Sequence, residues 1–313
     1  MVKKHLRIST ITNHQKITIL TKNPVRQNGY ECCGWPYYLS LPLMWLLTFY
    51  VMIKKKVYKL LNLSGPKTNS LFFDGLGKSC RNVKDYATSW KAMDIIYNHP
   101  FEGTLSVGGI LDEFYWRSMN CQALRNRYKL IKHLLRNNIS QFGKEVRLAS
   151  LACGSGQAIL ETIAELKSEG VIVKAILVDI NEEALKEAKV IAKKLGIGGQ
   201  IETFKADLSL ENNILKDFKP QIVEMLGFLD YAKEEQAITF LKNINKSLDK
   251  KGILITCNIN PNPEQHFLKW VINWPMIYRS PSQLINLAEK ANFEDCEVIL
   301  EPLKIHSILI AKK

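Results

Sequence analysis

The sequence is poor in cysteine and lacks the cysteine spacing typical of zinc sites. Its seven cysteines are an odd number among 313 residues, and none of them form a CxxC pair. A disulfide scaffold and a structural zinc site therefore have no support, and we expect no metal. This cysteine usage favours a reducing compartment, so we predict a cytoplasmic protein.

Acidic residues are scarce in the first 60 residues. This segment holds ten lysines and arginines but one acid, Glu31. The whole chain has 43 basic and 30 acidic residues, so the other 253 residues hold 33 basic and 29 acidic ones. The positive charge thus belongs mainly to an N-terminal arm. A nucleic-acid-binding fold carries its basic patch on the fold itself, so nucleic acid is not an expected partner.

Two phosphate-binding motifs are also absent. A GxGxxG motif on the turn 152–156 would need glycine where Ile159 stands, and the Walker A pattern occurs nowhere. The sequence therefore does not predict a dinucleotide site or a P-loop.

One long uncharged run is present, from 32 to 53, and Lys54–Lys56 follow it. About 20 apolar residues can span a bilayer as a helix. Pro36 and Pro42 restrict the predicted helix to 43–59, a length that suits a helix lying in the membrane interface better than one spanning it.

Three interpretations of this run stay open. The first is membrane association through residues 35–56, which would make a membrane surface a partner of the arm. The second is a helix packed on the fold. The third is translation that starts at Met44 or Met52, so that residues 1–43 are not native.

Short apolar strands alternate with helices in the C-terminal half of the chain. The strands are predicted at 146–151, 171–178, 200–206, 220–226, 252–257, 297–300 and 305–311. This alternation predicts a doubly wound, Rossmann-like α/β fold whose seven-stranded sheet has an antiparallel last strand. A helical N-terminal extension precedes it. We expect a basic arm with an apolar segment (1–56), a helical cap (57–141) and the Rossmann-like domain (142–313).

Polar residues at the strand ends predict an adenosine site. Ligands of such sheets bind beyond the C-terminal ends of the strands. Gly154 and Gly156 let the backbone approach a ligand closely. Asp179 ends the second strand, where a carboxylate can accept from ribose hydroxyls, and Asp207 ends the third, where it can accept from an exocyclic amine.

These motifs resemble those of the class I S-adenosylmethionine-dependent methyltransferases. Residues 148–156 (LASLACGSG), 177–181 (LVDIN) and 204–208 (FKADL) are similar to the family's glycine-rich, ribose-binding and adenine-contacting motifs. The resemblance covers about 142–313 and implies S-adenosyl-L-methionine as the cofactor. The cofactor-binding residues that it implies are Ser150, Ala152, Gly154, Gly156, Asp179, Ile180, Asp207 and Leu208.

The first motif departs from the family at two positions. Ser150 stands where the family usually has an acid, and Ala152 where it often has glycine. The family's acid organises the methionine end of the cofactor, so its loss suggests a replacement from a helix predicted at 112–135. An arginine offers a bidentate match to the methionine carboxylate. The candidates are Gln122, Arg125 and Arg127, with Arg125 as our choice.

Candidate catalytic residues follow from where the resemblance places the reacting centre, after the fourth strand. Glu224 and Tyr231 lie there, and Glu224 can serve as a base. His266, in an aromatic-rich insertion that we interpret as a substrate lid, is a second candidate base. Methyl transfer needs no metal, because the enzyme mainly positions a nucleophile and manages its proton.

We therefore predict a methyltransferase that acts on a small-molecule or lipid acceptor. Two alternatives stay open: a transferase that uses another group of the cofactor, and a non-catalytic, membrane-tethered scaffold that binds it.

Overall fold

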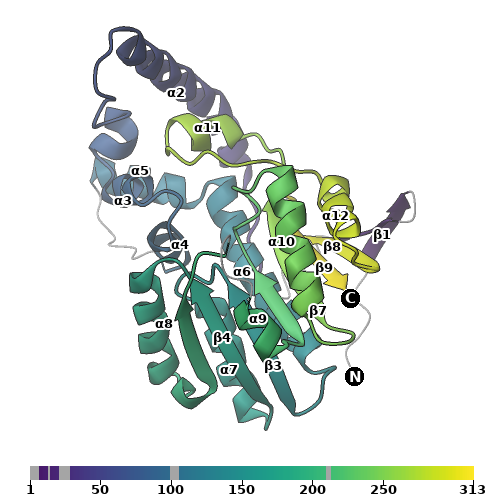
Figure 1. Cartoon of the computed structure of the whole chain (residues 1–313). Coiled ribbons are helices and arrows are strands. Elements are labelled where there is room, and N and C mark those ends of the chain that lie inside the picture. Colours follow the sequence, from purple (N-terminus) through teal and green to yellow (C-terminus); the bar gives the residue numbers. More distant parts are fainter. Residues whose placement is uncertain (1–6, 13–14, 21–28, 99–105, 209–212) are drawn as a thin grey trace. The chain divides into compact units, whose positions relative to one another are not determined.

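The computed structural model describes residues 7–12, 15–20, 29–98, 106–208 and 213–313 (Figure 1). The chain divides into two compact units. We call 1–30, 126–260 and 277–313 the sheet unit, and 31–125 and 261–276 the helical unit. The units differ from the predicted domains: residues 126–141 belong with the sheet, and 261–276 belong with the helices.

The sheet unit contains a nine-stranded sheet in the order β1-β2-β8-β9-β7-β6-β3-β4-β5. Strands β3 to β7 are parallel, and β9 runs antiparallel to both β7 and β8. The predicted fold class is confirmed. The strands are β1 (Arg7–Thr12), β2 (Gln15–Leu20), β3 (Glu145–Leu151), β4 (Ile172–Asp179), β5 (Ile201–Lys205), β6 (Ile222–Met225), β7 (Ile253–Ile259), β8 (Asp295–Leu300) and β9 (His306–Lys312).

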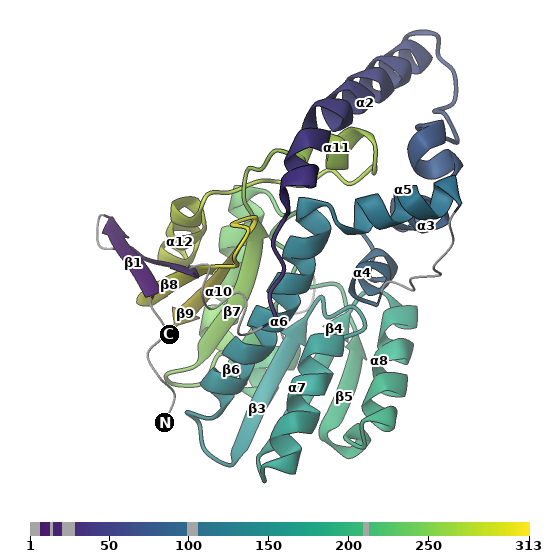
Figure 2. The ribbon, with the colours of Figure 1, turned by 180° about the vertical axis from the view of Figure 1, so that it is seen from behind.

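Helices cover both faces of the sheet (Figures 1 and 2). One core cluster joins α6, α7 and α8 to one face, and a second joins α10 and α12 to the other. Their bounds are α6 (Met119–Ile139), α7 (Gln157–Ser168), α8 (Glu182–Lys194), α9 (Asn213–Phe218), α10 (Glu234–Ser247) and α12 (Pro281–Lys290), with a short 3₁₀-helix at Gly198–Gln200.

Two strands of the sheet come from the N-terminal arm, which the sequence analysis treated only as a basic segment. β2 pairs in parallel with β8, and β1 pairs antiparallel with β2. The hydroxyl of Thr18 donates to Glu297 Oε1 at 2.9 Å. β2 therefore covers the edge of β8, an edge that would otherwise expose unpaired backbone groups.

The helical unit consists of short helices and one long one. These are α2 (Trp35–Leu60), the π-helix η1 (Leu71–Gly75), α3 (Lys78–Asp85), α4 (Trp90–Tyr97), α5 (Val107–Trp116), the first turns of α6, and α11 (Gln265–Trp270). α2 is the single helix in the described part of the chain that is long and apolar enough to cross a membrane, with 22% of its most apolar window buried.

The prediction that proline confines this helix to 43–59 is wrong. Pro36 lies in the first turn, where a missing N–H costs no hydrogen bond, and Pro42 lies inside the helix. The helix continues through Pro42 and packs against α11, as both views show (Figures 1 and 2).

The single helix predicted at 112–135 is also wrong, because the chain forms α5 and then α6 there. The buried carboxylate of Glu264 accepts from the backbone N–H groups of Met119 and Asn120, both at 2.9 Å. A carboxylate at this place satisfies the free donors of a helix N-terminus, so a new helix begins at Met119. Glu264 also accepts from the hydroxyl of Tyr37 on α2.

Residues before Met44 are part of both units. A start at Met44 would remove β1, β2 and Tyr37, and with Tyr37 the hydrogen bond to Glu264. The three interpretations of the N-terminal run stay open.

We expect deletion of residues 1–20 to destabilise the protein, because it removes β1 and β2 and exposes β8. The melting temperature should fall by roughly 2–4 °C for each kcal/mol lost, and aggregation should increase. Calorimetry and light scattering test this, with deletion of residues 1–6 as the control. Equal melting temperatures for all three proteins would contradict the role of β2.

Candidate active site

The candidate site lies at the C-terminal ends of the strands β3 and β6. The chain proceeds from β3 outward to β4 and β5, then returns to β6 on the other side of β3. In open α/β sheets this reversal of strand order creates a crevice in which ligands bind. Most residues predicted for the cofactor lie at or just beyond the C-terminal ends of β3, β4 and β5.

The turn 152–156 after β3 has a left-handed backbone at three positions. Gly154 and Gly156 have φ of 57° and 64°, and Ala152 has φ of 50°. A Cβ atom on Gly156 would lie 2.8 Å from Leu177 Cδ2, and the positive φ would strain any other residue, so this position favours glycine. Ala152, where the family often has glycine, adopts the left-handed conformation at a cost of about 1–2 kcal/mol.

Asp179, the last residue of β4, holds this turn in place. Its Oδ2 accepts from the N–H of Gly154 at 2.8 Å, and its Oδ1 accepts from the N–H of Asn181 at 2.8 Å. Asn181 in turn caps α8 through its side chain. Each carboxylate oxygen has a second lone pair, so Asp179 can still accept from two ribose hydroxyls.

The other predicted adenosine contacts flank this region. Ile180 is 63% exposed directly after β4, and Asp207 and Leu208 are half-buried directly after β5. The N–H of Ala206 donates to the carbonyl of Asp179 at 3.1 Å, so the ends of β4 and β5 are joined. These residues thus lie at the C-terminal ends of two neighbouring strands. Their contacts with an adenosine stay predictions.

Ser150 and Glu224 face each other across β3 and β6. They are partners in the register of the two strands, and the Ser150 hydroxyl donates to Glu224 Oε2 at 2.6 Å. Both are buried, with exposed fractions of 0% and 3%. A carboxylate is therefore present beside the position where the family has its acid, but it comes from the neighbouring strand.

The surroundings of Glu224 disfavour its charged form. Burial raises the pKa of Glu224 to about 7, although the Ser150 hydrogen bond and the charge of Arg127 oppose the rise. Arg127 lies on α6 and donates to the sulfur of Cys257 at 3.5 Å. Burial, with Asp179 and Glu224 nearby, raises the pKa of Cys153 well above its usual value, so this thiol stays neutral.

His306 adds an unsatisfied group to the same unit. It is buried, and neither ring nitrogen has a hydrogen-bond partner among the described residues. Burial and the nearby charge of Arg127 lower its pKa well below 6.5, so the ring is neutral. The sequence analysis did not select His306 as a site residue. Its register partner is Ile259 on β7.

The other predicted residues have varied local surroundings. Tyr231 follows β6 in the sheet unit and is 42% exposed. His266 is exposed and belongs to the helical unit. Arg125 also belongs to the helical unit, where it forms a bidentate pair with Glu31, at 2.8 and 2.6 Å, and stacks on Trp116. Their roles stay predictions.

Pairs of residues that the sequence analysis did not predict shape the loops after β6 and β7. The buried Asp230 accepts from Asn258 Nδ2 at 2.9 Å and from the N–H of Ile259 at 2.8 Å. Arg279 donates to the carbonyls of Leu229 and Ala232 and to Asn258 Oδ1. No local pattern identifies these pairs, because their members lie about 20–50 residues apart.

The fold and the site define a Rossmann-like methyltransferase. The family described as "Putative methyltransferase" matches residues 64–313, and the chain belongs to this family. It is an enzyme of the class I methyltransferases, and its cofactor is S-adenosyl-L-methionine, as the motifs implied. The match begins within the helical unit, so the family includes more than the Rossmann-like part.

Solved structures show the same fold. A protein from Bordetella parapertussis described as a "possible exported protein" is 16% identical, with a TM-score of 0.65, and the match covers 86% of this chain and 96% of that chain. The S-adenosylmethionine-dependent methyltransferase SibL in its apo form is 12% identical, with a TM-score of 0.52, covering 98% and 81%. No match is found among curated proteins.

The described residues fit the cofactor. The left-handed turn brings backbone N–H groups to the strand ends, and Asp179 retains acceptor capacity for a ribose. Arg127 and Glu224 supply a buried positive and a buried ionisable negative group for a zwitterionic amino acid. No three His, Cys, Asp or Glu side chains form a metal-binding group in the part of the chain that the structure describes.

We expect Glu224→Gln to raise stability at high pH. The pKa of Glu224 in the folded protein is about 7, above its usual 4.5, so Glu224 stays protonated to a higher pH in the folded state than in the unfolded state. Stability contributed by this group is thus lost as the pH rises from about 4.5 through 7. The variant should melt several degrees higher than the wild type at pH 8, and at the same temperature at pH 4.5.

Glu301, whose pKa burial also raises to about 7, is common to both proteins and cancels in this comparison. If the two melting curves differ by the same amount at both pH values, Glu224 is not the titrating group.

Proposed function

We propose that the protein transfers the methyl group of S-adenosyl-L-methionine to a small apolar or lipid acceptor that it meets at a membrane surface. The observation that carries the first half is the strand–turn–helix arrangement of β3, the turn 152–156 and α7, with Asp179 bound to the turn. The second half rests on the exposed apolar face of α2.

The cofactor supplies an activated methyl group on a sulfonium, and the protein's residues hold and orient it. We propose that the backbone of the turn 152–156 lies against the amino-acid part and that Asp179 accepts from the ribose hydroxyls. Asp207 is proposed to accept from the adenine amine. Tyr231 and His266 remain candidates for handling the acceptor's proton.

The alternatives from the sequence are separated by their products. Methyl transfer yields S-adenosylhomocysteine, transfer of another group yields a different nucleoside, and a non-catalytic scaffold yields neither. Mass spectrometry of the purified protein incubated with the cofactor and a membrane lipid extract distinguishes the three.

α2 has two different faces. Tyr37, Met44, Thr48 and Val51 are buried at helical spacing, and Tyr37 anchors the helix to Glu264. The opposite face forms an apolar stripe whose side chains are 43–81% exposed. We call this the α2 stripe: Trp35, Leu39, Leu43, Leu46, Tyr50, Ile53, Val57 and Leu60. Exposed apolar patches of this kind are typical of interaction sites.

The lysines after the uncharged run have different roles. Lys54 Nζ donates to the carbonyl of Thr68 at 2.9 Å, and Lys55 Nζ donates to the carbonyl of Trp270 at 2.5 Å. Lys56 and Lys59 are exposed. Lysines near an anionic leaflet contribute about 1 kcal/mol each, so we expect the stripe, rather than charge, to supply most of the membrane affinity.

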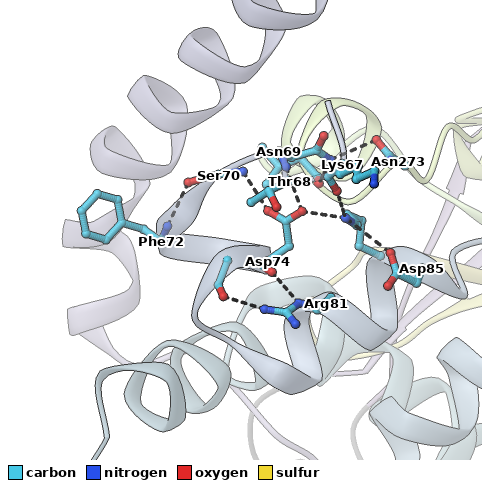
Figure 3. A network of polar contacts seen from close by, with 12 residues as sticks. Lys67, Thr68, Asn69, Ser70, Phe72, Asp74, Arg81, Asp85 and Asn273 are labelled. Carbon is cyan, nitrogen blue, oxygen red and sulfur yellow. Dashed lines mark hydrogen bonds and ion pairs between the residues drawn. The ribbon is translucent and has the colours of Figure 1, made fainter. Parts of the chain in front are cut away.

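The helical unit exposes further apolar side chains at the tip formed by η1. Leu71 and Phe72 of η1 are 61% and 64% exposed. A network around Asp74 holds this turn (Figure 3): Asp74 accepts from the N–H groups of Asn69 and Ser70 and from Lys84 Nζ, at 2.7–2.8 Å. The tip is therefore fixed by buried polar contacts, which supports a role in docking to an apolar surface.

We expect Asp179→Asn to weaken cofactor binding by at least about tenfold, because a charge-assisted hydrogen bond contributes roughly 1.5–3 kcal/mol. The amide keeps one acceptor for the turn, so the fold should survive, as circular dichroism would verify. Calorimetry with S-adenosylhomocysteine measures the effect. Glu182→Gln is the control, because Glu182 follows the same strand but forms only exposed ion pairs with Lys186 and Lys205. Unchanged affinity in a folded Asp179 variant would refute the assignment.

We expect Leu43→Gln/Leu46→Gln to lower the partition of the protein onto anionic phosphatidylserine vesicles by more than tenfold, since each buried leucine contributes about 1.5–3 kcal/mol. Co-sedimentation measures this, with Lys56→Gln/Lys59→Gln as the electrostatic comparison. These changes leave the strands and the buried face of α2 intact, unlike truncation of 1–56. A wild-type protein that forms dimers through α2 and ignores vesicles would overturn the membrane proposal.

A further inference from the structure

Glu224 is a buried carboxylate that has no hydrogen bond from a cationic side chain among the described residues. Glu224 accepts from the Ser150 hydroxyl, and Arg127 acts on it only through its charge. A buried carboxylate is expensive when it is ionised, and an apolar residue would be expected on a central strand such as β6. Its presence at the switch point of the sheet points to a ligand group of opposite charge.

The cofactor carries such a group. Its amino-acid part has an ammonium and a carboxylate on one carbon atom. Arg127 and Glu224 present one positive and one ionisable negative group in the sheet unit, both buried. The two pairs of charges are complementary, and β3 offers no acid of its own at the residue that pairs with Glu224, which is Ser150.

We propose that Glu224 on β6 supplies the negative charge that receives the ammonium group of bound S-adenosyl-L-methionine, with Ser150 as its positioning residue. This inference rests on the proposed function. The acid that the family usually has on β3 would then be replaced by one on the neighbouring strand, at the residue that pairs with Ser150 and on the same face of the sheet. Glu224 is then a binding residue and not the base of the reaction.

A consequence is that binding releases a proton. Burial keeps Glu224 partly protonated near pH 7, and an ammonium beside it favours the charged form. The proton leaves Glu224 for the buffer as the ligand binds. The groups that face Glu224 are Ser150 on β3, Arg127 on α6, and the thiols of Cys153 and Cys257.

These neighbours do not supply this proton. Burial raises the pKa of Cys257 to about 11 and that of Cys153 well above its usual value, so both thiols stay protonated at pH 7. An arginine stays charged at any pH used for binding. Proton release that peaks near pH 7 would therefore report on Glu224.

The first experiment compares three ligands by calorimetry: S-adenosylhomocysteine, an analogue in which hydrogen replaces its amino group, and 5′-methylthioadenosine, which lacks the whole amino-acid part. Glu224→Gln should weaken the first by at least about tenfold and leave the other two unchanged. The glutamine is isosteric and still accepts from Ser150, so the fold should be preserved.

The second experiment measures proton release on binding and tests a variant in which the acid is on β3 instead of β6. In wild-type protein at pH 7, the binding enthalpy of S-adenosylhomocysteine should vary with the ionisation enthalpy of the buffer, and in Glu224→Gln it should not. Ser150→Ala should shift this release to higher pH, since the lost hydrogen bond no longer lowers the pKa of Glu224. Ser150→Asp/Glu224→Ser returns the acid to β3 and should restore most of the affinity.

Each other outcome decides against the proposal. If Glu224→Gln binds all three ligands as the wild type does but loses methyl transfer, Glu224 is a base. If it weakens all three ligands equally, Glu224 acts on the structure of the site. If the wild type binds none of them, the proposed function itself fails, which is distinguishable because it does not depend on the variant. Should Glu224→Gln not fold, Ser150→Ala and the double variant carry the test.

Discussion

The carboxylate of Asp179 joins the parts of the chain on which the candidate site depends. It accepts from Gly154 in the turn after β3 and from Asn181 at the start of α8, while its own carbonyl accepts from Ala206 after β5. Three neighbouring strand ends thus meet at one residue. Because carboxylate hydrogen bonds to backbone N–H groups are strong, the left-handed turn, with its unfavourable Ala152, is held ready for a ligand.

The buried charges of the sheet unit favour function over stability. Glu224, Asp230 and Glu301 are all nine-tenths or more buried, and burial raises the pKa of each. Replacing such groups with apolar residues often stabilises a protein. Asp230 and Glu301 accept backbone hydrogen bonds that shape loops. Glu224 accepts from a side chain only, and this difference supports the ligand-binding role that we propose for it.

The helical unit combines polar anchoring with apolar exposure. Glu264 connects α2 to the start of α6, and Asp74 fixes the turn that carries Leu71 and Phe72. Each anchor is a buried carboxylate that accepts from backbone N–H groups, so each is directional and holds its element in one orientation. The apolar side chains that these anchors leave exposed are thereby part of a defined surface, as a docking function requires.

The sequence by itself determined the alternation of strands and helices, the glycine turn, and Asp179 and Asp207 at strand ends, because these features depend on neighbouring residues and on hydrogen bonds within a few positions. Only the tertiary structure decided what depends on distant residues. The pairing of Ser150 with Glu224 joins positions 74 residues apart, and β2 adds to β8 across more than 270 residues of chain. Packing between distant parts of the chain determines the strand register, the capping of α6 by Glu264, and which side of α2 is buried. No local sequence pattern predicts these features.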